Sequence, residues 1–293
     1  MQVVIDGAGD LPPALVEELD IAVVPINIMF GDEQFLSGVT MDHAAFYTKV
    51  QTVDSDNFPK TSQPTPYQME QAYRQILTTG ERQLLVITVS EKLSGTYESA
   101  VAAANALADE AEIEVFDSAA GSAVQGWMAV EAARMAGQGA GFDAILGCLE
   151  QMRDSASIYF LIDSLEYAVK GGRVSFIRST VASLLNIKAI MTVEDGLIVE
   201  GGRVRTYRKA LSFMVEATRN AVGTAPVQLA VMHANRAEAG QALLDMACAA
   251  LNVREHFLMD LAISVAVNLG PGALGLVAIP ANSNRLGTVA RPS

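Results

Sequence analysis

The stretch that decides the fold is Leu84-Leu85-Val86-Ile87-Thr88-Val89-Ser90-Glu91-Lys92-Leu93-Ser94-Gly95-Thr96-Tyr97. It is an apolar run that breaks into small polar residues and continues in a helical pattern. The apolar and β-branched run predicts a strand buried on both faces, and Ser94 fits the N-cap of a helix that continues to Leu107. The stretch therefore predicts a strand, a loop and a helix in that order.

The start of this helix is a candidate anion site. The backbone amides of Gly95 and Thr96 would point out of the helix end beside hydroxyl groups, and Gly95 lets a ligand approach the backbone closely. A structural cap without a ligand predicts the same residues, because such turns are common in α/β proteins. Both interpretations stay open at this point.

The same pattern occurs at two more strand ends. A strand over residues 2–5 ends at Asp6-Gly7, and a strand over 113–116 ends at Asp117-Ser118. The alternation of strands and helices predicts a parallel sheet covered by helices, with these polar turns at one edge. Asp6 fits either a contact with a ligand or the bracing of a loop amide.

A second group of hydroxyls precedes another helix. Thr65 as N-cap, Pro66 at the first helical position and Gln68 as the partner in a capping box together predict a helix start. Thr61 and Ser62 are then spare hydroxyls in an extended stretch held by prolines. They are available to a ligand or to solvent.

Several further elements follow from local pattern. We expect a strand over 21–29, a helix capped by Thr40, a hairpin at Glu194-Asp195-Gly196 and a strand over 264–267. The 293 residues are 51% hydrophobic, and the composition changes near Ser155. We therefore expect two α/β domains, over 1–157 and 158–280, followed by a polar tail over 281–293.

Charge limits the possible partners. The net charge is −13, with 33 acidic and 20 basic residues, which argues against a nucleic acid or an anionic membrane. Residues 203–209 contain four cations, which fit an acidic partner surface or simple solvation. No basic leader precedes a long apolar stretch and no run has membrane-spanning length, so we expect a cytoplasmic protein without stable membrane insertion.

Motifs for catalysis or metal binding do not occur. Cys148 and Cys248 lie in apolar helical patterns and are expected to be buried free thiols. The three histidines are far apart, and there is no HExxH, CxxC, GxSxG or phosphate-loop pattern. We therefore assign no catalytic residue, no metal and no cofactor.

Eight separated blocks recur in an order typical of a known family. They are Asp6 with Asp10-Leu11-Pro12; Thr61-Ser62-Gln63-Pro64; Ser90-x-x-Leu93-Ser94-Gly95-Thr96-Tyr97; Asp117-Ser118; Leu165-Glu166-Tyr167 with Lys170-Gly171-Gly172-Arg173; Leu184-Leu185-Asn186-Ile187-Lys188; Arg203-x-Arg205-Thr206; and Gly270-Pro271-Gly272-Ala273. In this order they resemble the DegV family of bacterial fatty-acid-binding proteins over nearly the whole chain.

The resemblance implies a fold and a ligand. It implies two α/β domains, the second with a mixed sheet, and one long-chain fatty acid buried near the domain junction. In the family, the residues at the positions of Thr61 and Ser94 hold the carboxylate, with Ser62, Gly95 and Asn268 beside them. Neutral hydroxyls and helix-end amides can hold an anion without a salt bridge, which agrees with the local patterns.

The resemblance also implies a partner. Family members with known roles present the fatty acid to a separate ATP-dependent kinase subunit, which phosphorylates the carboxylate. On this analogy Arg173, with Arg203 and Arg205, would dock the kinase or neutralise the head group. Two positions depart from the family: Gly7 replaces a hydroxyl residue, and Asn268 replaces a histidine that could carry a proton.

Three alternatives compete with this hypothesis. The first is a lipid carrier with a different partner. The second is a stand-alone enzyme related to dihydroxyacetone kinase, for which Asp6 and Asp117 are the only acid/base candidates at the expected site. The third is an interaction or structural protein without a ligand, which a filled apolar cavity would contradict.

Overall fold

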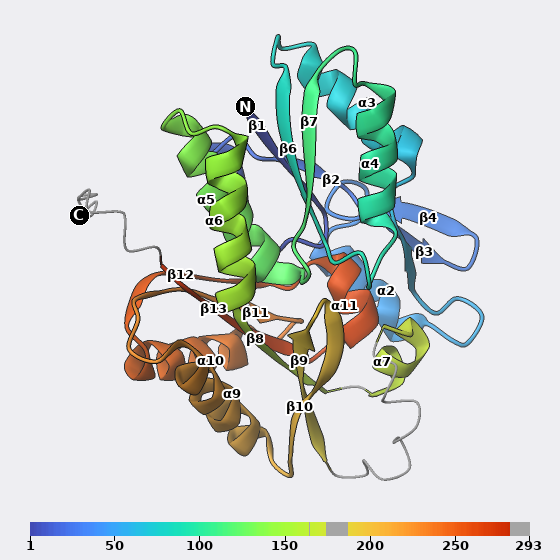
Figure 1. Ribbon diagram of the computed structural model, residues 1–293. Helices are drawn as coiled ribbons and strands as arrows, with labels where there is room; N and C mark the ends of the chain where they lie inside the picture. The colour runs from blue at the N-terminus through green and yellow to red at the C-terminus, as the bar shows by residue number, and fades with distance from the viewer. Residues whose placement is uncertain (164, 174–186, 282–293) are drawn as a thin grey trace.

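The computed structural model describes residues 1–163, 165–173 and 187–281 (Figure 1). These residues form a four-stranded, a six-stranded and a three-stranded sheet, with helices packed on the two larger ones. Residues 282–293 of the expected tail lie outside the described ranges, as do Leu184, Leu185 and Asn186 of the resemblance blocks.

The four-stranded sheet is parallel throughout, as the strand and helix pattern predicts. Its order is β2-β1-β6-β7, where β1 is Gln2–Asp6, β2 is Ala22–Val24, β6 is Gln83–Thr88 and β7 is Glu112–Asp117. Four helices cover it: α3 (Pro66–Leu77) and α4 (Thr96–Ala106) on one face, and α5 (Ser122–Gly137) and α6 (Phe142–Ser155) on the other (Figure 1). The carboxyl ends of β1, β6 and β7 therefore share one edge.

Strand β6 is buried on both faces because its apolar run is continuous. Leu84 and Val86 belong to the core cluster under α3 and α4, whereas Leu85 and Ile87 belong to the cluster under α5. All four side chains are fully buried. This confirms the prediction made from the apolar run, since alternate residues of a strand point to opposite faces.

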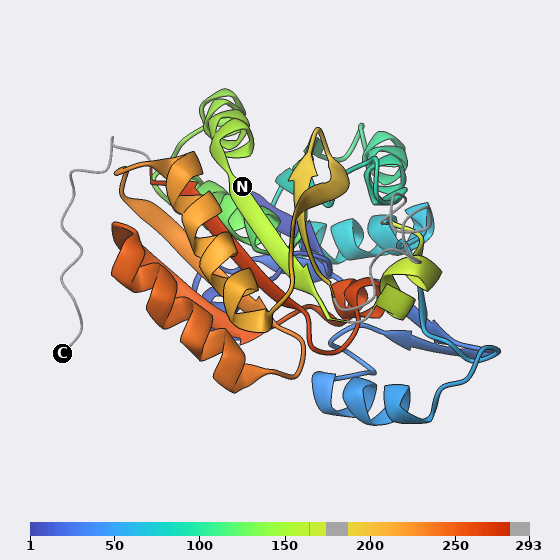
Figure 2. The ribbon, with the colours of Figure 1, turned by 90° about the horizontal axis from the view of Figure 1, so that it is seen from below.

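The six-stranded sheet is mixed, which confirms the expected fold class. Its order is β10-β9-β8-β13-β11-β12, and only β11 and β12 pair in parallel. The strands are β8 (Ser157–Ile162), β9 (Lys188–Glu194), β10 (Leu197–Val204), β11 (Val227–His233), β12 (Val253–Asp260) and β13 (Leu274–Pro280). Helices α9 (Tyr207–Val222) and α10 (Ala237–Ala250) lie next to each other on its outer face (Figure 2).

The inner face of this sheet packs against the parallel sheet through α5. One core cluster contains Val3 and Ile5 of β1 together with Met232 of β11 and Val277 of β13. The chain passes from α6 into β8 at Ser157, but the core continues across that point. The domain boundary expected after residue 157 stays a prediction.

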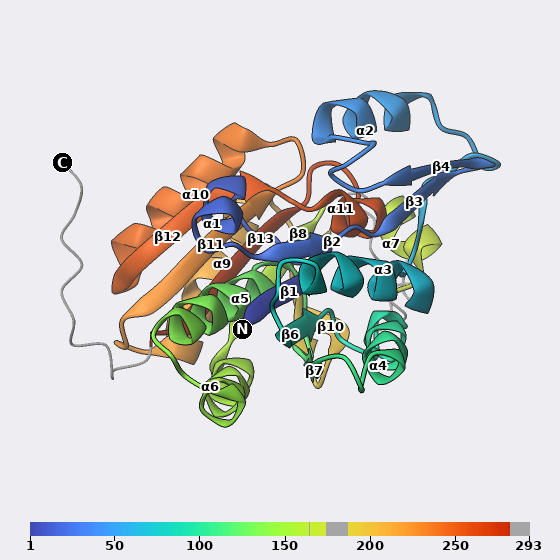
Figure 3. The same cartoon turned by 90° about the horizontal axis from the view of Figure 1, so that it is seen from above.

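The three-stranded antiparallel sheet lies at one end of the molecule with α2 (Figure 3). Its order is β4-β3-β5, with β3 at Asn27–Phe30, β4 at Glu33–Leu36 and β5 at Lys60–Ser62, while α2 spans His43–Lys49 and leads into a 3-10 helix at Val50–Thr52. The prediction of one strand over 21–29 is wrong. Pro25 separates β2 from β3, because proline has no N–H for a sheet.

Two further predictions in this part of the chain need correction. Thr40 does not cap α2; Asp42 does, accepting a 2.8 Å hydrogen bond from the backbone N of Ala45. Thr40 instead accepts from the backbone N of Leu36 at 2.8 Å. The expected strand over 264–267 is helix α11, Ile263–Leu269, because a short apolar run fits either form until packing decides.

Two other local predictions are confirmed, and one is wrong. The capping box of Thr65 and Gln68 is present at the start of α3, and Glu194-Asp195-Gly196 turns between β9 and β10. Cys148 is buried, but Cys248 is exposed, so its expected burial is wrong. Short helices α1 (Pro13–Glu18) and α7 (Leu165–Gly171) complete the described elements. None of the described helices combines the length and apolar character needed to cross a membrane.

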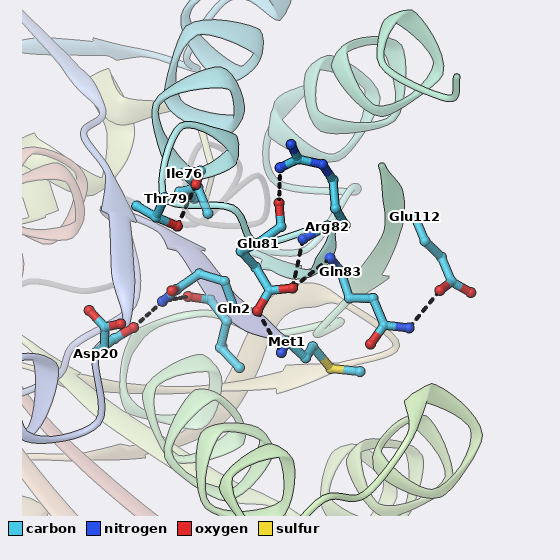
Figure 4. Close-up of polar contacts among 10 residues, drawn as sticks. Met1, Gln2, Asp20, Ile76, Thr79, Glu81, Arg82, Gln83 and Glu112 are labelled. Atoms are coloured by element: carbon cyan, nitrogen blue, oxygen red, sulfur yellow. Dashed lines mark hydrogen bonds and ion pairs between the residues drawn. The ribbon is translucent and has the colours of Figure 1, made fainter. Parts of the chain in front are cut away.

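Polar contacts hold the amino edge of the parallel sheet (Figure 4). Glu81 accepts hydrogen bonds from the N-terminal amine at 2.8 Å and from the backbone N of Arg82 and Gln83 at 2.7 and 2.9 Å. These donors, the amine first, lower the pKa of Glu81 to about 2. These hydrogen bonds fix the loops at the amino edge of the sheet. The polar turns that are expected to carry the site lie at the opposite, carboxyl edge.

Candidate functional site

A largely apolar cavity lies between the carboxyl edge of the parallel sheet, strand β5, the β9–β10 hairpin and helix α11. Its lining includes five of the predicted site residues: Thr61, Ser62, Ser94, Arg173 and Asn268. They come from four separate segments of the chain. Gly95, Arg203 and Arg205 are not part of the lining.

The loop that carries Ser94 differs from its predicted form. Helix α4 begins at Thr96 with Gly95 as N-cap, so the prediction of Ser94 as N-cap is wrong. The Ser94 and Thr96 hydroxyl oxygens lie 2.8 Å apart, and the backbone N of Ser94 donates to the carbonyl of Ser90 at 3.1 Å. Because Ser94 does not cap the helix, its hydroxyl can face the cavity that it lines.

Gly95 brings the two hydroxyl loops together. A Cβ atom at this position would lie 2.9 Å from Nε2 of Gln63, which is closer than real Cβ contacts allow. The backbone φ of Gly95 is −72°, so no left-handed conformation requires glycine here. The glycine is needed for close approach: its missing side chain lets Gln63, two residues after Thr61, pack against the Ser94 loop.

Thr61 and Ser62 are half-buried on β5, an edge strand that pairs with β3. Thr61 pairs with Ile28 in the small sheet. Asn27 donates to the carbonyl of Gln63 at 3.1 Å and accepts from Gln68 of the capping box at 3.1 Å. Within the described ranges neither hydroxyl has a hydrogen-bond partner. Both residues line the same cavity as Ser94.

Asn268 contributes an amide from α11. Its Nδ2 donates to the carbonyl of Ser264 at 2.9 Å, while its Oδ1 is buried and finds no partner among the described residues. A Cβ atom at Gly171 would lie 2.7 Å from this Oδ1, so Gly171 lets α7 pack against Asn268. The amide offers hydrogen bonding but no charge.

Arg173 alone carries a charge among the described residues of the lining. It is exposed just after α7, where its Nη1 donates to the carbonyl of Gly171 at 2.8 Å. The nearby Lys170 is otherwise engaged: it pairs with Glu166 at 2.8 Å and its Nζ lies 4.0 Å from the centre of the Phe58 ring. Among the described residues, Arg173 is therefore the cation that a ligand head group would meet at the cavity.

The other two predicted arginines are separate from the cavity. Arg203 lies in β10 and its Nη2 donates to Glu200 at 2.7 Å. Arg205 follows β10 and is exposed. The structure therefore does not bring Arg203 and Arg205 to the hydroxyls.

The two acid/base candidates, Asp6 and Asp117, accept hydrogen bonds from backbone amides of neighbouring loops. Asp6 is fully buried and accepts from the backbone N of Val89 at 2.7 Å and of Ala8 at 2.9 Å. Burial away from water raises the pKa of Asp6. Asp117 accepts from the backbone N of Ala119 at 2.9 Å. Neither carboxylate lines the cavity. The sequence left two roles open for Asp6, contact with a ligand or bracing of a loop amide, and its hydrogen bonds match the second.

Two serines of the cavity lining, Ser122 and Ser264, were not predicted as site residues. Ser122, at the start of α5, donates to the buried carboxylate of Asp10, which also accepts from the backbone N of Ala262. Ser264 of α11 donates to the carbonyl of Gly7 at 2.7 Å. Each contact joins residues more than 100 positions apart in the chain, so neither partner could be identified from local sequence.

Gly7, the first departure from the family pattern, sits in a crowded turn. A Cβ atom there would lie 3.2 Å from the backbone N of Ile26, and Gly7 itself does not line the cavity, although Ala8 does. The hydroxyl contributed near this turn comes instead from Ser264. The turn at Gly7 is therefore held by a hydrogen bond from helix α11.

Known proteins resemble this chain over almost its full length. A family model described as uncharacterised proteins of the DegV family matches residues 1–281. A DegV domain-containing protein of Halalkalibacterium halodurans is 31% identical over 281 residues, covering 94% of this chain and 96% of that protein.

Solved structures are similar in fold as well. A DegV family protein from Thermus thermophilus, described by its fatty acid binding, has a TM-score of 0.88 at 28% identity and covers 96% of this chain and 99% of its own. A stearic-acid-binding protein from Eubacterium ventriosum has a TM-score of 0.86 at 25% identity, with 96% and 98% covered.

Proposed function

The chain belongs to the DegV family, and from this premise we propose that it binds a long-chain fatty acid in the cavity, with the carboxylate at Thr61 and Ser94. The observation that carries the proposal is an apolar cavity whose lining includes hydroxyl residues from two segments, Thr61 and Ser62 of β5 and Ser94 before α4, which approach each other at Gly95. Solved relatives that bind fatty acids support it.

The physical chemistry of the ligand suits this cavity. Burying each CH₂ group contributes about 0.8 kcal/mol, so a sixteen-carbon tail gains on the order of 10 kcal/mol. The carboxylate would accept hydrogen bonds from the hydroxyls of Thr61, Ser62 and Ser94 and from amides near Gly95, with the amide of Asn268 close by. Hydrogen bonds to an ionised oxygen are stronger than neutral ones, so the head group needs no buried salt bridge.

The finer part of the proposal is presentation of the head group to an ATP-dependent kinase subunit. In that reaction a carboxylate oxygen attacks the γ-phosphorus of ATP, and ADP leaves as the acyl phosphate forms. Arg173 is the cation at the cavity and would neutralise the head group or contact the kinase, with Arg203 and Arg205 offering further positive charge outside it. This chain would act as the ligand-binding subunit, because Asp6 and Asp117 already hold loop amides.

Lipid extraction tests the proposal directly. Solvent extracts of the purified chain should contain one long-chain fatty acid per molecule by mass spectrometry. Thr61→Ala and Ser94→Ala should each lower retention several-fold, because each removes a hydroxyl from the head group. Ser212→Ala is the matched control, since that serine is exposed on α9. Wild-type protein that carries no acyl chain, even after incubation with palmitic acid, would overturn the proposal.

The kinase step needs a separate test. Arg173→Ala should reduce the acyl phosphate formed per molecule of bound lipid when an ATP-dependent fatty acid kinase is added, with the bound lipid of each protein measured by extraction. If the fatty acid bound to the variant is phosphorylated as well as that bound to the wild type, Arg173 has no role in presentation. If the fatty acid bound to the wild type is not phosphorylated, presentation to such a kinase is overturned.

A further inference from the structure

One part of the cavity wall is formed by a methionine folded over a glycine. Met232 of β11 and Gly275 of β13 are directly opposite each other in the six-stranded sheet. On the other side of Gly275, Phe160 of β8 occupies the corresponding position. All three residues line the cavity. Gly275 is therefore a gap in the sheet surface between two large side chains.

The end of the Met232 side chain occupies this gap. A Cβ atom at Gly275 would lie 2.7 Å from Cε of Met232, closer than two carbon atoms can pack. Met232 is 1% exposed, so its side chain is held in the core rather than in solvent. Methionine is unbranched and flexible, and can therefore change its shape when its neighbour changes.

A displaced Met232 would move into the cavity. It belongs to the close-packed core that includes Phe160 and Val277, where the space beside it is already filled. The cavity that it lines is the open side. The hydroxyls of Thr61 and Ser94 come from β5 and the loop before α4, whereas this pair lies on the mixed sheet among apolar side chains. A fatty acid with its carboxylate at the hydroxyls would therefore place its acyl chain against this pair.

We propose that the Met232 and Gly275 pair sets the length of the acyl chain that the cavity accepts. This inference rests on the proposed function, because it assigns a determinant of ligand choice within the same site. With the methyl group over Gly275, the wall is recessed. Pushing the methyl group out would shorten the space for the chain, and removing it would lengthen that space.

Substitutions at the two positions should shift ligand choice in opposite directions. Gly275→Ala forces Met232 toward the cavity and should favour shorter chains, whereas Met232→Ala removes the side chain beyond Cβ and should favour longer ones. One methylene more or less is worth about fourfold in relative occupancy. The double variant should resemble Met232→Ala, because the alanine at 275 then has no side chain to displace, so the single effects should not add.

A competition experiment measures this preference. The full chain is loaded with an equimolar mixture of myristic, palmitic and stearic acids, and the bound fraction of each is measured by mass spectrometry. Val231→Ala is the control, since Val231 is the buried neighbour of Met232 that faces α9 and α10 on the other side of the sheet. It should lose stability without changing the ratio of bound acids.

The outcomes separate this inference from the proposed function. Opposite shifts of about fourfold or more in the myristic-to-stearic ratio support it. Wild type and variants that retain acyl chains in the same ratio overturn it and leave fatty acid binding intact. Wild type that binds none of the three acids overturns both. If circular dichroism shows that Gly275→Ala does not fold, Met232→Ala decides the question. A shift of this variant toward stearic acid supports the inference, and no shift overturns it.

Discussion

The hydroxyl of Ser90 donates a 2.8 Å hydrogen bond to the carbonyl oxygen of Gly196, which joins the loop before α4 to the tip of the β9–β10 hairpin. Lys92 adds a second link, because its Nζ donates to the carbonyl of Asp195 at 2.8 Å. Val193 and Ile198, on either side of the tip, line the cavity. These contacts hold the hairpin, seen in gold beside α11 in Figure 1, against the parallel sheet and close one side of the cavity.

Gly196→Ala should loosen the hairpin and speed the release of a bound fatty acid. A Cβ atom at this position would lie 2.6 Å from Oγ of Ser90, and the φ of +76° costs a non-glycine residue about 1 kcal/mol. The exchange rate against a fluorescent fatty acid measures the effect, with an expected rise of several-fold.

Gly38→Ala provides the matched control for the hairpin. Gly38 has a similar φ of +73°, but a Cβ atom there meets nothing within 4 Å. Backbone strain should lower the free energy of unfolding of Gly38→Ala by a similar amount, whereas the exchange rate of the fatty acid should not change. Equal exchange rates in both variants would show that the hairpin contact does not govern release.

Asp10→Asn should remove a pH-dependent part of the stability. Burial raises the pKa of Asp10 from 3.8 in the unfolded chain to about 7 in the folded protein. The folded state therefore binds the proton more tightly. The stabilisation is complete below pH 3.8 and is lost as the pH rises toward and through 7, with a slope of up to about 1.4 kcal/mol per pH unit.

Urea unfolding between pH 5 and 8 measures this slope. The wild type should lose stability across this range, and Asp10→Asn should flatten the curve, because an amide has no proton to release there. Its Oδ1 can still accept from the backbone N of Ala262, so the fold should persist. An unchanged slope in the variant would mean that another group causes the pH dependence.

Gly95→Ala should weaken fatty acid retention while costing little stability. The new Cβ atom would contact Nε2 of Gln63, the end of a flexible side chain that can move away at low cost. Gln63 also lines the cavity, so its displaced side chain would crowd the shared head-group site between the Thr61 and Ser94 segments. Retained lipid after dialysis should fall several-fold, whereas the free energy of unfolding should fall by less than about 1 kcal/mol.

A second substitution checks the cause. Gln63→Ala combined with Gly95→Ala removes the side chain that the new Cβ meets, so the double variant should recover part of the lost retention. No recovery would indicate that Gly95 is needed for direct contact with the ligand rather than for the approach of Gln63.

Thr65→Ala should destabilise the protein by about 1 kcal/mol, because the N-cap hydroxyl accepts from the backbone N of Gln68 at the start of α3. Urea unfolding measures the change. Thr78→Ala at the other end of the helix is the control; its exposed hydroxyl only donates to the carbonyl of Gln75, and the change should be small. Equal losses in the two variants would contradict a specific role for the cap.

Short-range patterns predicted a substantial part of this fold. The run from Leu84 to Ile87 identified a strand buried on both faces, and Thr65 with Gln68 identified the start of α3. Both depend on residues that are neighbours in the chain. The hydroxyls at Thr61 and Ser94 were also found from local sequence: the capping box at Thr65 leaves Thr61 spare, and Ser94 lies where a buried strand leads into a helix. The family resemblance assigned them to one ligand.

Tertiary packing decided what short-range patterns left open. The run that forms α11 could be a strand until its contacts with α7 and β5 are known. Strand β12 was not predicted because it lies at the sheet edge and contains three consecutive polar residues, Arg254, Glu255 and His256, which break the alternation typical of a strand. The site was decided in the same way: Gly95 matters through Gln63, Ser122 through Asp10, and Met232 through Gly275. Each pair is distant in sequence, so only the folded chain brings its atoms within contact distance.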